Sequence, residues 1–137
     1  MTRIFIAFLL VFQVSAVSAH DGRPVYLEVN QISDTEYELA WRIPFTVQPY
    51  NLPAIYLEGS CNEKKTLSAT TGLRGKRLYE CVGQDVALQI SLHFPQTNPS
   101  LSSIVRIQRS GFRSDFLHAG PGVTVIDIPS LINDNSL

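Results

Sequence analysis

The stretch PVYLEVNQISDTEYELAWRI, residues 24–43, decides the fold of this protein. Apolar side chains occupy every second position in each of its two halves, and mostly polar side chains stand between them. A period of two is that of a β-strand with one buried face, and Ser33-Asp34-Thr35 between the halves is typical of a turn. The stretch therefore predicts a β-hairpin formed by residues 24–30 and 36–43. Its apolar positions are Val25, Leu27, Val29, Tyr37, Leu39, Trp41 and Ile43.

The same period recurs along the rest of the chain. It is clearest over residues 86–93, and it returns over residues 105–108, where Ser110-Gly111 predicts a tight turn before a returning strand. We predict an all-β domain over residues 20–129, an antiparallel, immunoglobulin-like β-sandwich of about seven to eight strands. A small β-barrel is the alternative, because strand pattern alone does not separate the two architectures. The less regular or returning strands are expected at residues 52–57, 66–71, 77–81, 112–117 and 123–128.

The first residues of the chain have the three parts of a secretory signal peptide. Arg3 supplies a positive charge, residues 4–12 are continuously apolar, and small residues lead to Ala19. The apolar run is much shorter than the roughly 20 residues of a membrane span. We therefore predict a signal peptide over residues 1–19, a mature chain without a membrane span, and secretion to the periplasm or the extracellular space. Residues 130–137 have few apolar anchors and predict a flexible C-terminal tail.

The charge balance bears on the kind of partner. The chain carries 11 basic and 12 acidic residues, for a formal net charge of −1. A protein that binds nucleic acid or a membrane surface through its charge needs a clear cationic excess, so we expect no nucleic-acid partner. Lys64-Lys65 and the RGKR run at residues 74–77 are interpreted as loop charge without an anion-binding role.

Cys61 and Cys81 are the only two cysteines. An even number of cysteines in an exported protein predicts a disulfide. A redox pair or a metal site with two thiolates is the alternative, but the two residues form no C-x-x-C motif and no histidine lies between them. Trp41, on an alternating strand, is expected in the core or between sheets rather than as a platform for a ligand.

The sequence shows no motif of a catalytic site. There is no G-x-S-x-G, H-E-x-x-H, P-loop or G-x-G-x-x-G pattern, and we predict that the protein is not an enzyme. A terminal amine and an imidazole on one residue can chelate copper or nickel, so His20 at the start of the mature chain is a candidate metal ligand. His93 or His118 could complete such a site. The ordinary alternative is a free, solvated N-terminus.

Four segments together resemble a known family. They are HDGRPVYLEV at residues 20–29, YELAWRIP at 37–44, LYEC at 78–81 and IVRI at 104–107. They are similar to the exported N-terminal region of HupE/UreJ-type membrane proteins, which has an RPAYLE strand after the signal and a W-K-x-P strand end. The resemblance covers most of residues 20–128. It implies that four positions of this chain are shared structural ones: Trp41 and Pro44 in the core, and Cys61 and Cys81 in the disulfide.

In that family the soluble β-rich region precedes a multi-span membrane domain associated with hydrogenase and urease accessory functions and with nickel handling. The sequence here stops shortly after Pro129, where the family enters its membrane spans, so nickel transport is not carried over. We predict an exported, non-catalytic binding or accessory module without a cofactor, whose partner is a protein, in particular a membrane protein. The alternative is a small periplasmic protein that binds copper or nickel through His20.

Overall fold

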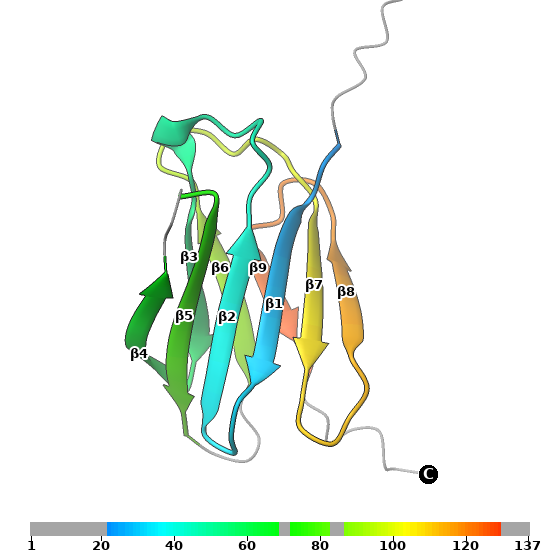
Figure 1. Ribbon diagram of the computed structural model, residues 1–137. Helices are drawn as coiled ribbons and strands as arrows, with labels where there is room; N and C mark the ends of the chain where they lie inside the picture. Colours follow the sequence, from blue (N-terminus) through cyan, green and yellow to red (C-terminus); the bar gives the residue numbers. More distant parts are fainter. Residues whose placement is uncertain (1–21, 69–71, 83–86, 130–137) are drawn as a thin grey trace, which may run out of the picture.

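A computed structural model of the protein describes residues 22–68, 72–82 and 87–129. Within these residues the chain forms nine β-strands and one short 3-10 turn, and the strands build two sheets that face each other (Figure 1). The all-β prediction is confirmed, with slightly more strands in the described residues than expected. The elements are β1 (Val25–Gln31), β2 (Glu36–Arg42), η1 (Pro49–Asn51), β3 (Ala54–Gly59), β4 (Cys61–Ser68), β5 (Arg74–Cys81), β6 (Leu88–His93), β7 (Ser103–Gln108), β8 (Asp115–Ala119) and β9 (Val125–Ile128).

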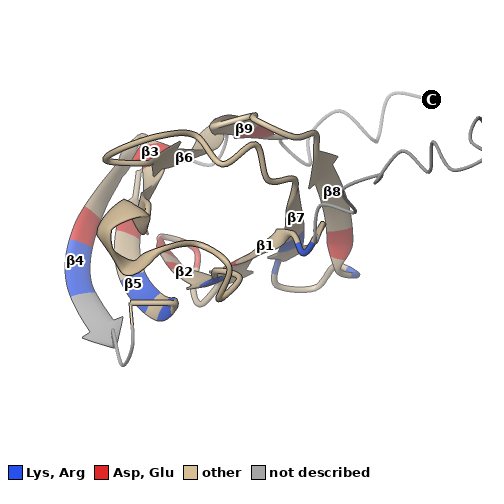
Figure 2. Cartoon of the chain, turned by 90° about the horizontal axis from the view of Figure 1, so that it is seen from above, with Lys and Arg blue, Asp and Glu red and all other residues tan. Residues whose placement is uncertain are grey.

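The two sheets differ in size. The larger has the strand order β4-β5-β2-β1-β7-β8, and the smaller has the order β3-β6-β9. Seen from above, the larger sheet curves round one side of the core, and the smaller sheet covers the other side (Figure 2). No strand pairing joins the two sheets in the part of the chain that the structure describes. The fold is therefore a β-sandwich, and the barrel alternative is wrong.

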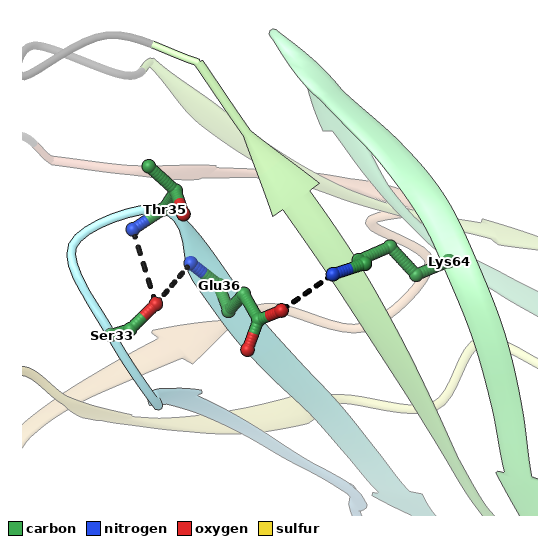
Figure 3. Close-up of polar contacts among 4 residues, drawn as sticks. All are labelled: Ser33, Thr35, Glu36 and Lys64. Atoms are coloured by element: carbon green, nitrogen blue, oxygen red, sulfur yellow. Dashed lines mark hydrogen bonds and ion pairs between the residues drawn. The ribbon is translucent and has the colours of Figure 1, made fainter.

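The hairpin predicted from residues 24–43 is present. β1 and β2 pair in antiparallel register, with Leu27 opposite Trp41 and Val29 opposite Leu39. The Ser33 hydroxyl closes the turn, because it accepts hydrogen bonds from the backbone N–H groups of Thr35, at 3.4 Å, and Glu36, at 3.1 Å (Figure 3). A short polar side chain that bonds to the backbone two or three residues ahead is typical of such turns.

One strand pair departs from the expected antiparallel arrangement. β1 and β7 lie parallel, with Leu27 beside Val105 and Val29 beside Ile107. Parallel neighbours need a long connection, and here the connection contains five strands, among them β3 and β6 of the smaller sheet. The alternating pattern of each strand is the same in either direction, so the sequence could not show this pairing.

The core lies between the two sheets and consists of the alternating apolar positions. Leu27, Leu39 and Val105 of the larger sheet and Ile55 and Ile90 of the smaller one are fully buried. Each side chain of this size contributes roughly 1.5–3 kcal/mol by leaving water. Burial of this row on both sheets holds the sandwich together.

The structure places Trp41 and Pro44 at the end of the hairpin. Pro44 is buried, and Trp41 is half-buried and packs against the core. The indole lies against Gly75 of the neighbouring strand β5, where an added Cβ would come within 2.2 Å of Trp41 Cζ2. Glycine is thus required at position 75, because any side chain there would displace the ring.

Two strand boundaries differ from the sequence predictions in a way that matters for the site. β4 begins at Cys61 rather than at residue 66, and β5 begins at Arg74 rather than at residue 77. Lys64 and Lys65 therefore lie on β4, and their interpretation as loop charge was wrong. The same holds for Arg74 and Lys76, which lie on β5. Their strand is fixed by pairing with β2, where Arg74 lies opposite Arg42 and Lys76 opposite Ala40.

Candidate functional site

The outer face of the larger sheet carries a row of basic and aromatic side chains near one end. Tyr26 of β1 pairs with Arg42 of β2, and Arg42 pairs with Arg74 of β5. Directly paired side chains on one face of a sheet have Cβ atoms about 4.5–5.5 Å apart. The sheet thus holds two arginines side by side next to a tyrosine.

These side chains border a hollow of about 400 Å³, which we call the arginine hollow. Its lining combines three arginines and two aromatic rings with four apolar residues, and no aspartate or glutamate is among the lining residues that the structure describes. A hollow of this composition has a positive rim and an apolar wall. It is lined by Arg23, Pro24, Tyr26, Arg42, Ile43, Pro44, Phe45, Leu73 and Arg74.

Two of the arginines lie over the aromatic rings. Arg23 Cζ is 4.7 Å from the centroid of the Phe45 ring, and Arg42 Cζ is 5.6 Å from that of Tyr26. Such cation–π contacts contribute about 0.5–1 kcal/mol at exposed sites and orient the guanidinium. The rings themselves are open to solvent, with 44% of Tyr26 and 65% of Phe45 exposed. Since guanidinium donors lie in the plane of the group, a stacked arginine can still bind an anion at its edge.

A second, smaller hollow of about 250 Å³ adjoins the first, and we call it the Ala40 hollow. Ala40 has the shortest side chain of its row, between Glu28 on one side and Lys76 on the other. Both charges have partners, because Glu28 is 3.9 Å from Arg106 and Lys76 is 3.4 Å from Glu38. The Ala40 hollow is lined by Tyr26, Glu28, Ala40, Trp41, Arg42, Arg74, Gly75 and Lys76.

The backbone beneath the arginine hollow is anchored at both ends. The Ile43 N–H donates to the Leu73 carbonyl oxygen at 2.7 Å, and the Val25 N–H donates to that of Ser102 at 2.9 Å. The loop that carries Phe45 is tied down by the buried side chain of Asn51. Asn51 Nδ2 donates to the Thr97 carbonyl oxygen at 2.8 Å. The walls of the hollow are therefore pre-organised.

Acidic side chains gather at the opposite end of the same face. Glu36 of β2 forms an ion pair of 2.6 Å with Lys64 of β4, across the intervening strand β5 (Figure 3). The hydrogen bond from Lys64 to Glu36 and the charges of Glu36 and Glu80 raise the pKa of Lys64. The outer face thus runs from arginines at one end to carboxylates at the other.

A second aromatic cluster joins the sheets and has a structural role. Arg77 Cζ lies 4.4 Å from the centroid of the Tyr56 ring and 5.4 Å from that of the Trp41 ring. Arg77 Nη1 also lies 3.6 Å from Glu63 Oε2. Burial lowers the pKa of Arg77, but hydrogen bonding to Tyr56 and the Glu63 carboxylate outweigh it and raise the pKa above its ordinary value. This arginine links β5 of the larger sheet to β3 of the smaller one.

The cysteine prediction is confirmed, since Cys61 and Cys81 form a disulfide between directly paired positions of β4 and β5. The proposed metal ligand His20 lies outside the described residues. His93 stands at the end of β6 in the smaller sheet, and His118 on β8 in the larger one. Among the residues that the structure describes, no three His, Cys, Asp or Glu side chains are grouped to hold a metal ion. The copper or nickel site stays a prediction.

Sequence reasoning missed the arginine hollow. The alternation of β1 and β2 already places Tyr26 and Arg42 on the outer face, which was a usable signal. The contribution of Arg74 could not be found in this way, because it depends on the pairing of β5 with β2.

Comparisons with known proteins found no matching family model, no matching curated protein and no matching solved structure. The resemblance to HupE/UreJ-type proteins therefore stays a prediction. In the described ranges, none of the helical segments has the length and apolar character needed to cross a membrane.

Proposed function

We propose that this protein is an exported, non-catalytic binding module that holds an acidic group of a protein partner in the arginine hollow. The observation that carries the proposal is the convergence of Arg42 and Arg74 on a hollow with exposed aromatic rings and no carboxylate in its described lining. Arginine matches a carboxylate with two parallel N–H donors. Arginine and aromatic side chains also dominate the energetic centres of protein interfaces.

Export fits the same proposal. The signal-like pattern of residues 1–19 and the Cys61–Cys81 disulfide are both typical of a protein made for an oxidising compartment. The resemblance to HupE/UreJ-type proteins favours an accessory role beside a membrane protein. An acidic surface segment of such a partner is the kind of group that the arginine hollow would bind.

The test uses N-acetyl-phenylalanine, which carries one carboxylate beside one aromatic ring, as a minimal probe. Titration into the ¹⁵N-labelled mature protein should give saturable shifts in the amide signals around Tyr26, Arg42 and Arg74. Arg42→Glu and Arg74→Glu should each weaken binding at least about tenfold, because each replaces an attractive charge by a repulsive one.

Arg113→Glu is the matched control, since Arg113 is exposed and lines neither hollow. It should leave the affinity for N-acetyl-phenylalanine unchanged. Shifts that do not saturate, or an equal loss in Arg113→Glu, would contradict the proposal.

A further inference from the structure

The two hollows adjoin on the outer face of the larger sheet, and we call the two together the trough. They share three lining residues, Tyr26, Arg42 and Arg74. Strand register places the row Tyr26, Arg42, Arg74 next to the row of Glu28, Ala40 and Lys76 along the strands. The row of Tyr26, Arg42 and Arg74 therefore separates the apolar wall of the arginine hollow from the Ala40 hollow, and the three parts follow one another along the strand direction.

The spacing along the trough matches an extended peptide. Successive outward rows of a sheet are two residues apart, about 7 Å, and an extended peptide repeats its side chains on one side at the same distance. Three side chains at positions i, i+2 and i+4 of a bound strand would then face the trough. The first would meet the exposed ring of Phe45, the second Arg42 and Arg74, and the third Ala40.

The charges along the trough select the partner. The arginine end has no carboxylate in its described lining, whereas the Ala40 end contains both Glu28 and Lys76, one on each side of Ala40. The positive charge of the trough is thus concentrated at one end, which suits a peptide with its acidic group at one position better than a uniformly anionic lipid surface. The short Ala40 side chain leaves room for an apolar residue at the other end.

Building on the proposed function, we infer that this trough binds an extended segment of a partner protein with the pattern apolar-x-acidic-x-apolar, and that its Asp or Glu side chain lies between Arg42 and Arg74. The acidic group supplies the charge pairing, and Ala40 provides the space for the last apolar residue. The segment lies on the sheet face and uses side-chain contacts, because the pairing edges of β1, β2 and β5 are already taken by neighbouring strands.

The test compares two probes on the same protein. The peptide acetyl-LTETL-amide should bind the mature protein at least about tenfold more tightly than N-acetyl-phenylalanine. The peptide acetyl-LTQTL-amide, in which Gln replaces the Glu, should lose most of this gain in affinity.

Ala40→Leu places a larger side chain in the Ala40 hollow. It should weaken peptide binding about tenfold without changing the affinity for N-acetyl-phenylalanine. Asn30→Leu, on the same face of β1 but outside both hollows, is the matched control and should change neither affinity.

A second measurement needs no variant that could misfold. With the alanine methyl groups ¹³C-labelled, the Ala40 methyl of the wild-type protein should show an intermolecular NOE to the last leucine of the bound peptide. If the peptide binds no more tightly than N-acetyl-phenylalanine, or if the NOE is absent at saturation, the trough inference is overturned while the arginine hollow stands. If neither probe binds, the proposed function fails as well. Binding to phosphatidylglycerol vesicles that Ala40→Leu leaves unchanged would overturn the inference in favour of a lipid partner.

Discussion

Tyr79 lies on the inner face of β5 with 2% of its surface exposed, and its hydroxyl accepts a hydrogen bond of 3.2 Å from the Leu57 N–H. Leu57 belongs to β3, an edge strand of the smaller sheet, so this hydrogen bond joins the two sheets, which no strand pairing connects in the part of the chain that the structure describes. A buried backbone N–H without a partner is costly, since it has lost its hydrogen bonds to water. Tyr79 therefore stabilises the fold by accepting the hydrogen bond of the Leu57 N–H on β3.

Replacement of this hydroxyl tests its role. Tyr79→Phe keeps the ring but leaves the Leu57 N–H without an acceptor, so the free energy of unfolding should fall by about 1–3 kcal/mol. Urea unfolding followed by the fluorescence of Trp41, the only tryptophan, measures the change. Tyr50→Phe is the control, because 70% of Tyr50 is exposed, and it should stay within about 0.5 kcal/mol of the wild type. A Tyr79→Phe variant as stable as Tyr50→Phe would show that the hydrogen bond contributes nothing.

β4 is fixed to the larger sheet by a disulfide and two ion pairs in addition to its backbone pairing. It lies at the edge of the larger sheet, and its register with β5 shifts twice, between Glu63 and Lys65 and between Thr66 and Ser68. Irregular pairing weakens an edge strand but also makes it a poor template for pairing with other chains. The disulfide from Cys61 to Cys81 and the ion pairs of Glu63 and Lys64 compensate for the irregular pairing.

Removal of the disulfide should therefore act on this element. The bond joins residues 20 positions apart, and in the chain-entropy model a loop of this size contributes about 3 kcal/mol. The double variant Cys61→Ala/Cys81→Ala should lose about this amount in urea unfolding. Hydrogen exchange should accelerate in β4 before it does in β1 or β7. Adding dithiothreitol should lower the stability of the wild type and leave the double variant unchanged, and equal stability with and without the bond would contradict the prediction.

Across the whole molecule, the positive and negative charges are separated in space although they nearly cancel in sum. The formal net charge is only −1, yet one end of the larger sheet carries Arg42 and Arg74 and the other carries Glu36, Glu38 and Glu80. A partner would therefore approach in one orientation, since electrostatic complementarity acts mainly on encounter and alignment. The overall composition conceals this feature completely.

The stability of the whole molecule should fall at alkaline pH. Hydrogen bonding and the charge of Glu36 raise the pKa of Lys64, and burial raises that of Tyr79. In both groups the folded state favours the protonated form, so their contribution is present below the unfolded pKa values, 10.5 and 10.0, and is lost as pH rises through the folded ones.

Urea unfolding at a series of pH values measures the fall in the free energy of unfolding. The series begins at about pH 9, roughly one unit below the unfolded pKa values. Absorbance of the tyrosinate follows the ionisation of Tyr79. The double variant Lys64→Met/Tyr79→Phe should start less stable and decline less steeply. An equally steep decline in the double variant would assign the pH dependence to other groups.

Most of the fold could be predicted from the residues, and about half of the site. The strands around Leu27, Leu39, Leu88 and Val105 follow from alternation, and the disulfide follows from two cysteines in a chain that is predicted to be exported. For the site, the same alternation places Tyr26 and Arg42 outward. It could not place Arg74 beside them, because the charged RGKR run has no apolar alternation of its own and becomes a strand only by pairing with β2.

The sequence by itself determined which side chains of each strand face the core, because residues two apart share a face of a strand whatever lies beside it. It also determined the number of available disulfides and the formal net charge of −1. Only the tertiary structure decided the strand order, the parallel pairing of β1 with β7, and the arginine hollow that brings Arg23, Arg42 and Arg74 together. The reason is physical: alternation is a local property, whereas the choice of a neighbour among strands distant in the chain depends on how the whole core packs.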